Sequence, residues 1–280
     1  MAKLPILESP TLLTIDRKIE EGQDDWRRAH LGASLIGHSC DRFLWYSFRW
    51  YSEPEFQGRI LRLFRRGHGE EINIVADLRL AGVEVSEGPK DGEQWRFESL
   101  GGHFGGSMDA AVLGLLEAPK TWHVAEFKTH NKKSFDALVK DKVEKSKPQH
   151  YAQMQSYMHK SGMSRAVYIA VCKDDDRYYL ERIRYDKYFA GELEEKADRV
   201  IFSKQPLQRI SERPDYFMCK WCQHYDACHR NMAPQQINCR TCTKSSPKED
   251  GSWFCGFKDS VLTLDDQKTL AQDCRGYSAR

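Results

Sequence analysis

Two carboxylates and a lysine near the middle of the chain, Asp109, Glu126 and Lys128, are the residues best suited to chemistry. Side chains alternate across a strand, so in HVAEFKT those of Glu126 and Lys128 share one face and that of Phe127 points to the other. Paired carboxylates bind hard cations such as magnesium or manganese, which activate water and stabilise charge on a phosphate. The pattern predicts phosphodiester hydrolysis in which Lys128 orients the water or neutralises the transition state.

A hairpin is expected to bring the two carboxylates together. The stretches WRFESLGGHFGGSMDAAVLG and TWHVAEFKTH are typical of two strands joined by LLEAPK. A hairpin centred between positions 117 and 118 places Asp109 opposite Glu126, with Cβ atoms about 4.5–5.5 Å apart. Glycines in HFGGSMDAAV allow close backbone approach. The alternative is an ordinary exposed pair on an amphipathic strand, with Asp109 in a turn, since so short a motif often matches by chance.

A third carboxylate could come from a long helix expected over residues 57–80, which should stop near Gly82. Glu71 is the preferred candidate, and Glu70 and His68 compete with it for the same role. The alternative for the two neighbouring glutamates is a solvated helix surface, which the spacing alone barely distinguishes from a metal site.

Basic and amide side chains at helical spacing are candidates for contact with nucleic acid. On the expected helix 57–80, three arginines share one face and could contact successive phosphates. On a second helix, bracketed by Pro148 and Gly162, two glutamines and a tyrosine lie at four-residue steps, and such groups hydrogen-bond phosphates and sugars. A solvated helix surface is the alternative for both sets. The residues are Arg59, Arg62 and Arg66, and Gln149, Gln153 and Tyr157.

Four motifs follow one another along the chain: Gly67-x-x-x-Glu71, Gly106-Ser-Met-Asp109, Glu126-Phe-Lys128 and Gln153-x-x-x-Tyr157. In this order they resemble the motifs of the PD-(D/E)XK nuclease superfamily, and most nearly its RecB-type branch. That branch includes the RecB nuclease domain, CRISPR-associated exonucleases with iron-sulfur clusters, and phage enzymes that resect DNA ends like lambda exonuclease. The resemblance spans about residues 31–230.

The resemblance implies a nuclease core with a central mixed sheet flanked by helices. It implies that Asp109 and Glu126 bind the metal and that Phe127 offers only its backbone carbonyl. Lys128 would be the catalytic lysine. Glu71 would be the metal ligand of the first motif, where glutamate is typical of phage exonuclease-like members and histidine of RecB-type ones.

The same resemblance assigns a role to the second helix. Gln153 and Tyr157 match the Q-x-x-x-Y element that this branch uses beside its active site. The resemblance therefore implies that both belong to the catalytic residues.

Eight of the nine cysteines are expected to bind metal, because a cytoplasmic chain keeps its thiols reduced. Three cysteines lie within ten residues, and such a group normally requires a fourth ligand. The resemblance implies that a cysteine before the core is this ligand and that the four cysteines hold a 4Fe-4S cluster. Spacing alone does not separate iron-sulfur from zinc, and His224 or His229 could complete a local zinc site instead. Ligation would close the two ends of the chain around the core. We call Cys40, Cys219, Cys222 and Cys228 the first cysteine set.

A second group of four cysteines begins with a C-x-x-C pair and suits a structural zinc ribbon or knuckle, a kind of tail that often touches nucleic acid or a partner protein. The alternative is that Cys255 and Cys274 are unrelated surface thiols. Cys172 lies in an apolar run, where a buried thiol without function is expected. We call Cys239, Cys242, Cys255 and Cys274 the second cysteine set.

These residues must be positioned by a folded core of ordinary size. The chain has 280 residues, of which 40% are hydrophobic and 30% charged, which is typical of a globular protein. The net charge of +2 neither demands nor excludes nucleic acid. No apolar run is long enough to span a bilayer, and the first residues lack the features of a secretory signal. We therefore expect a cytoplasmic protein of a bacterial or phage-infected cell, with no membrane partner.

The element pattern predicts an α/β fold. We expect helix over residues 31–51, a hairpin formed by the runs RAVYIAVCK and RYYLERIRY, and a helix over residues 189–202. The predicted organisation is an N-terminal extension over residues 1–25, a nuclease domain over 26–230 closed by the first cysteine set, and a zinc-ribbon-like tail over 231–280.

The function that fits these features is a magnesium- or manganese-dependent DNA exonuclease that processes DNA ends in phage or prophage recombination or repair. A recombination or single-strand-binding protein is an expected partner. One alternative is an endonuclease of the same fold. Another is a non-catalytic nucleic-acid-binding protein stapled by metal, and a third is an iron-sulfur carrier.

Overall fold

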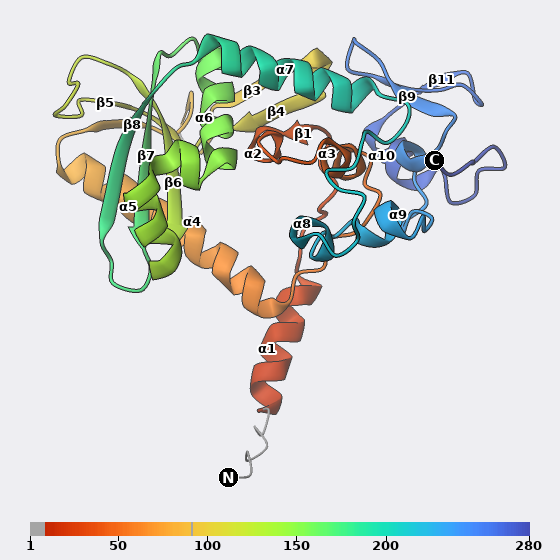
Figure 1. Ribbon diagram of the computed structural model, residues 1–280, viewed down its shortest axis with the longest axis horizontal. Coiled ribbons are helices and arrows are strands. Elements are labelled where there is room, and N and C mark those ends of the chain that lie inside the picture. The colour runs from red at the N-terminus through yellow and green to blue at the C-terminus, as the bar shows by residue number, and fades with distance from the viewer. Residues whose placement is uncertain (1–8, 91) are drawn as a thin grey trace.

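A computed structural model describes residues 9–90 and 92–280 and contains a central five-stranded sheet (Figure 1). The strand order is β2-β5-β6-β7-β8. Only β6 and β7 pair in parallel, and the other neighbours are antiparallel, so the sheet is mixed. The expected α/β class is confirmed. The strands are β2 (Glu84–Ser86), β5 (Ala110–Leu113), β6 (His123–His130), β7 (Arg165–Cys172) and β8 (Tyr178–Arg184).

Helices cover both faces of this sheet (Figure 1). On one face Ile74 and Val75 of α4 pack with Phe127 and other apolar side chains of the central strands. On the other face α5 and α6 pack against Tyr168 and its neighbours. Burial on both sides explains why β7 is an almost unbroken apolar run. The three helices are α4 (Gly58–Leu80), α5 (Lys132–Ser146) and α6 (Pro148–Ser161).

Two smaller sheets and several short helices surround the central layers. One sheet has the order β1-β4-β3 and the other β11-β10-β9. The strands are β1 (Leu31–Gly32), β3 (Arg96–Ser99), β4 (Phe104–Ser107), β9 (Ser245–Pro247), β10 (Trp253–Cys255) and β11 (Ser260–Leu262). The remaining helices are α1 (Pro10–Glu21), α2 (Ala33–Ile36), α3 (Asp41–Phe48), α7 (Lys187–Phe202), α8 (Phe217–Lys220), α9 (Tyr225–His229), α10 (Leu264–Thr269) and the 3-10 turns Leu100–Gly102 and Cys239–Thr241.

Several expected elements are confirmed. The helix expected over 57–80 is α4, and Gly82 follows it with φ of +82°. Pro148 begins α6, and Gly162 ends it with φ of +73°, a conformation that glycine adopts readily. The expected hairpin is β7 and β8, and the helix expected over 189–202 is α7, which begins two residues earlier.

Two expectations are wrong. The segment 31–51 is not one helix but β1, α2 and α3, separated at Gly37, where the backbone lies against α6. The run expected as a single strand before β6 is divided into β3, a 3-10 turn, β4 and β5. Gly101 and Gly102, with φ of +66° and +88°, turn the chain so that β3 and β4 join a separate sheet.

The C-terminal residues pack directly on the central layers. Trp253 belongs to the same apolar cluster as Phe48. The buried guanidinium of Arg240 lies over the rings of Trp50 (3.9 Å) and Trp253 (4.7 Å) and donates to the carbonyls of Phe48 (3.1 Å) and Ala29 (2.9 Å). Residues on both sides of position 230 therefore share one apolar cluster, and the predicted domain boundary stays a prediction.

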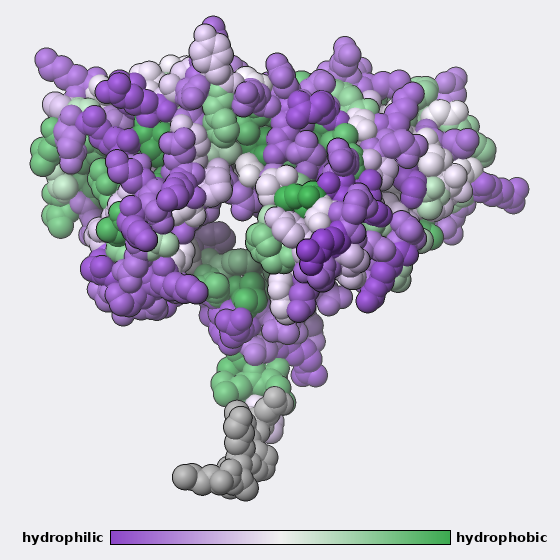
Figure 2. Space-filling model, in the orientation of Figure 1, coloured by the Kyte–Doolittle hydropathy of each residue, from purple (hydrophilic) through white to green (hydrophobic). Residues whose placement is uncertain are grey.

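The surface is largely hydrophilic and is hollowed between the sheet layers and the C-terminal part (Figure 2). In the described residues, no helix has both the length and the hydropathy required to cross a membrane.

Candidate functional site

The carboxylates and the lysine predicted from the sequence lie together at the centre of the sheet. The Lys128 ammonium forms an ion pair with Glu126 and lies 3.7 Å from Asp109 Oδ2. It also donates to the Phe127 carbonyl at 2.9 Å. The Phe127 amide in turn donates to Asp109 Oδ2 at 2.8 Å. One short stretch of β6 thus gathers two carboxylates, an ammonium and a backbone carbonyl.

The strand register creates this arrangement. Ala110 of β5 pairs with Ala125 of β6, so the next position along each strand places Asp109 beside Glu126, as the predicted hairpin requires. Alternation is also as predicted, because Val124 packs in the cluster that includes α6 and Phe127 packs in the one that includes α4. Asp109 itself precedes β5 and is therefore free to bond the β6 backbone.

The Glu126 carboxylate is fully buried; the Lys128 ammonium contacts its Oε1, whereas Oε2 has no hydrogen-bond partner among the described residues. Burial raises its pKa to about 8, against the opposing effect of Lys128 and with a further contribution from the negative charge of Asp109. A buried carboxylate that one ammonium satisfies only in part is costly to keep charged unless further hydrogen bonds or a cation stabilise it. The alternative of an ordinary exposed pair is therefore wrong for Glu126.

Glu71 is the third carboxylate that the structure brings to this place. It lines one cavity with Asp109, Phe127 and His68. Burial, followed by the charge of Asp109, raises the pKa of Glu71. Glu70 instead accepts a hydrogen bond from its helical neighbour Asn73 at 3.3 Å. Geometry therefore favours Glu71 over Glu70, while His68 stays close by.

Gln153 and Tyr157 belong to α6 and lie on the face of the sheet opposite to α4. Gln153 Nε2 donates to the Tyr157 hydroxyl at 3.4 Å, and that hydroxyl donates to the Ser107 carbonyl at 2.7 Å. Burial and then the charge of Glu126 raise the pKa of Tyr157. A Cβ at Gly106 would lie 2.7 Å from the Tyr157 hydroxyl, so glycine there permits the contact. The predicted close approach at HFGGSMDAAV is confirmed.

A buried chain of polar side chains beside the site was missed by the sequence reasoning. The Tyr168 hydroxyl lies 2.8 Å from both His130 Nε2 and His150 Nδ1. Tyr168 pairs in register with Glu126 on the neighbouring strand. Burial, together with the nearby Lys128 charge, lowers the pKa of His150 to about 3, so this imidazole is neutral. Its position three residues before Gln153 was the available signal, because both share one face of α6.

The residues predicted to contact DNA are placed less uniformly. Arg62 forms an ion pair with Asp16 of α1. Arg66 donates to the Lys173 carbonyl at 2.8 Å, and Arg59 is exposed. Gln149 is half-buried where α6 meets α2. The three arginines therefore do not stand equally free for phosphate contact, and their role stays a prediction.

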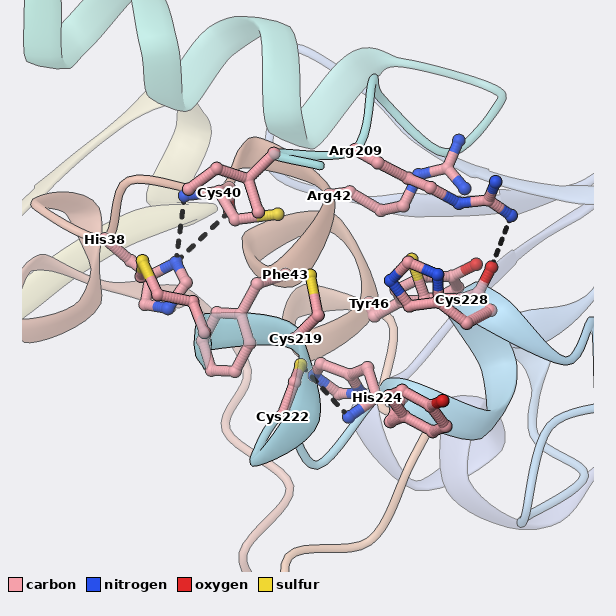
Figure 3. Close-up of a pocket in the computed structure, with 14 residues that line it drawn as sticks. His38, Cys40, Arg42, Phe43, Tyr46, Arg209, Cys219, Cys222, His224 and Cys228 are labelled. Carbon is pink, nitrogen blue, oxygen red and sulfur yellow. Dashed lines mark hydrogen bonds between the residues drawn. The ribbon is translucent and has the colours of Figure 1, made fainter. Parts of the chain in front are cut away.

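The first cysteine set lines one cavity between α3 and the segment around α8 and α9 (Figure 3). Cys40 precedes α3 and lies far along the sequence from the other three members, as predicted. Burial and the neighbouring thiols raise the pKa of Cys222 to about 11. The backbone N–H of His224 donates to the Cys222 sulfur at 3.4 Å, an arrangement that stabilises a thiolate.

Both histidines considered as substitute ligands line this same cavity. His224 is buried, its Nε2 lies 3.0 Å from Ser47 Oγ, and its Nδ1 has no hydrogen-bond partner. His229 Nε2 is likewise without a partner. The geometry therefore leaves the choice between an all-cysteine and a mixed ligand set open.

The second cysteine set lines another cavity, in the C-terminal part. Burial and the three other thiols raise the pKa of Cys239 to about 11. The Lys244 N–H donates to the Cys242 sulfur at 3.4 Å, the same arrangement as at Cys222. Cys255 is buried, and it lines this cavity together with Cys274, which is half-buried.

The side chains at each site are of types that bind metals, although their spacing does not enclose a metal ion. Orphaned carboxylate oxygens suit a hard cation, and clustered thiols suit zinc or an iron-sulfur cluster. In residues 9–90 and 92–280, however, no three His, Cys, Asp or Glu side chains stand close enough to hold one metal ion. Binding at any of these sites would have to draw the ligands closer together.

Comparison with known proteins gives structural neighbours only. No family model and no curated protein matches the sequence. An alkaline exonuclease, LHK-Exo from Laribacter hongkongensis, is similar with a TM-score of 0.42 and 18% identity over 66% of this chain and 90% of that chain. LHK-Exo in complex with dAMP gives a TM-score of 0.42 and 19% identity over 62% and 87%. A phage-related exonuclease from Haemophilus somnus gives 0.35 and 16% over 47% and 65%.

Proposed function

We propose that this chain is a magnesium- or manganese-dependent DNA nuclease, and specifically an exonuclease that processes DNA ends. The observation that carries the proposal is the fully buried Glu126 carboxylate, which is ion-paired to Lys128 beside Asp109 and keeps one oxygen without a hydrogen-bond partner. A fold does not retain such a costly group for stability alone, and strongly perturbed carboxylates mark functional sites.

The chain's own groups divide the work of phosphodiester hydrolysis. Asp109, Glu126 and the Phe127 carbonyl would hold the cation, with Glu71 completing the oxygen ligands. When bound, the cation activates a water molecule and stabilises charge on the phosphate. Lys128 carries a positive charge at the same place, and its bond to the Phe127 carbonyl fixes its direction toward the developing charge.

The two cysteine sets are proposed as structural metal sites. The first would hold a 4Fe-4S cluster or zinc, and the second zinc. Each joins segments that are distant in sequence, so ligation energy becomes folding energy.

The test compares the purified chain with its Glu126→Gln and Lys128→Ala variants on end-labelled linear and closed-circular DNA, with manganese, magnesium or EDTA. We expect metal-dependent loss of linear DNA only, reduced at least about 100-fold in both variants because each removes charge from the transition-state environment. Glu117→Gln and Lys120→Ala are the matched controls, since both residues lie in the exposed turn between β5 and β6 and should keep full activity.

The other outcomes discriminate between the alternatives. Cutting of circular DNA would replace the exonuclease by an endonuclease. DNA binding without cleavage under every metal condition would contradict the proposed enzymatic activity and favour a nucleic-acid-binding protein. Cleavage of RNA but not of DNA would show that RNA is the substrate.

A further inference from the structure

The segment that carries the first cysteine set also exposes large aromatic side chains. Phe217 is 67% exposed and Trp221 is 83% exposed. By contrast Trp45, Trp50 and Trp253 are at most 2% exposed. Leaving two large apolar side chains in water forgoes the stabilisation that their burial would contribute. An exposed apolar patch of this kind marks a binding surface.

The cysteines explain why this exposure is fixed. Cys219 and Cys222 direct their sulfurs into the cavity. Phe217 begins α8 and Trp221 is the residue that ends it, so the two exposed rings flank Cys219 along the chain. The segment that carries Cys219 and Cys222 thus presents two rings to solvent.

The charges around these rings are positive. Lys220 Nζ lies 5.5 Å from the centre of the Trp221 ring, and no ion pair of Lys220 occurs among the described residues. Each acidic residue nearby in the sequence is already bound by an arginine: Glu212 by Arg209 (2.7 Å), Asp215 by Arg213 (2.9 Å) and Asp226 by Arg230 (2.9 Å). The free charge beside the rings is therefore that of an ammonium, which attracts phosphate.

Exposed rings beside a cation without an ion pair are the features that bind unpaired nucleotides, whose bases stack on aromatic side chains while basic groups follow the backbone. We propose that Phe217, Lys220 and Trp221 form a stacking platform for single-stranded DNA. The proposal rests on the proposed function for its choice of partner. Figure 1 shows α8 apart from the sheet that carries Glu126, so the platform would hold the strand without taking part in cleavage.

The experiment uses the full, metal-loaded chain with Glu126→Gln as the background, so that the DNA stays intact. Oligo-dT is titrated while tryptophan fluorescence and oligonucleotide anisotropy are recorded. We expect stacking to quench the emission of Trp221 and Trp221→Phe to lose this quenching. Trp221→Ala and Phe217→Ala should each raise the Kd for oligo-dT about 10-fold, from the free energy of stacking one base.

A duplex of equal length distinguishes stacking from simple charge attraction, and its Kd should change less than about two-fold. Trp221→Tyr keeps a ring and should restore most of the affinity. Tyr188→Ala is the matched control, because Tyr188 is 86% exposed on α7 and should not affect binding. Metal content and circular dichroism of each variant show whether the loop stays folded.

Two results would overturn the platform: quenching that persists in Trp221→Phe, or oligo-dT affinity unchanged in Trp221→Ala, which would leave the patch to a protein partner. An equal loss for duplex and single strand would also contradict it. The proposed function fails separately, when the native chain cleaves no DNA under any metal condition while Trp221→Ala still weakens binding to oligo-dT.

Discussion

At the residue scale, the site is a balance between burial and charge. Glu126 lies in a fully buried place that disfavours its negative charge, and Lys128 only partly offsets that cost. Asp109 is better satisfied, because the Phe127 amide donates to it. The two carboxylates therefore differ in environment, and a bound cation would stabilise the charged form of Glu126 more than that of Asp109.

The raised pKa of Glu126 predicts how stability depends on pH without added magnesium or manganese. The folded chain keeps this proton up to about pH 8, whereas the unfolded chain releases it near the ordinary value of 4.5. The free energy of unfolding should therefore fall as pH rises through this window. Glu126→Gln removes the effect. We expect the Tm of the variant, relative to the native chain, to rise steadily across the window; a constant difference would contradict it.

Tyr168 is predicted to be a positioning residue, acting through His150 on the surroundings of Lys128. Tyr168→Phe removes the hydroxyl that contacts both histidines. Such outer partners typically contribute 10- to 100-fold, so we expect kcat to fall about 10-fold while KM for DNA is unchanged. The control is Tyr179→Phe, whose hydroxyl donates to Glu181 on the same strand, β8. A lower Tm with native kcat would show a merely structural role.

At the element scale, close packing of α2 on α6 sets where Gln153 and Tyr157 lie. A Cβ on Gly37 would come within 2.6 Å of the Gln149 Cα and 2.8 Å of the Ala152 Cβ. Backbone atoms cannot move aside cheaply, so α6 would have to shift as a unit.

Gly37→Ala is therefore expected to lower the free energy of unfolding by about 1–3 kcal/mol and to reduce DNA cleavage. Urea unfolding and initial rates on linear DNA measure the two effects. Gly191→Ala is the control: Gly191 lies within α7 with no atom within 4 Å of an added Cβ, so alanine should raise stability by about 0.5–1 kcal/mol. Native activity in Gly37→Ala would show that the position of α6 is not critical.

At the scale of the whole molecule, segments that are distant in sequence pack together on one core. The first cysteine set joins Cys40 to the segment after α7, and Arg240 fixes the C-terminal part under Trp50. The predicted tail is thus packed as part of the core through its apolar and guanidinium contacts, whatever its metal content.

Cys40→Ser is expected to lose metal from the first cysteine set and to lower Tm, because ligation closes a long loop. Metal analysis and visible absorption measure the loss of metal, and thermal unfolding measures the change in Tm. The presence of iron or of zinc in the native chain identifies the kind of site. Cys172→Ser is the control, since Cys172 is buried in β7 and lines neither cysteine cavity. Equal metal content in both variants would exclude Cys40 as a ligand and favour His224 or His229.

The sequence by itself determined the parts that depend on local spacing. Alternation placed Glu126 and Lys128 on one strand face, a count along the hairpin placed Asp109 beside Glu126, and glycine and proline marked the ends of α6. Only the tertiary structure decided the rest. It buried Glu126 completely, separated Glu71 from Glu70, and brought His130, His150 and Tyr168 together from three elements. Burial and contacts between distant segments depend on how layers pack, and no periodicity along one segment records them.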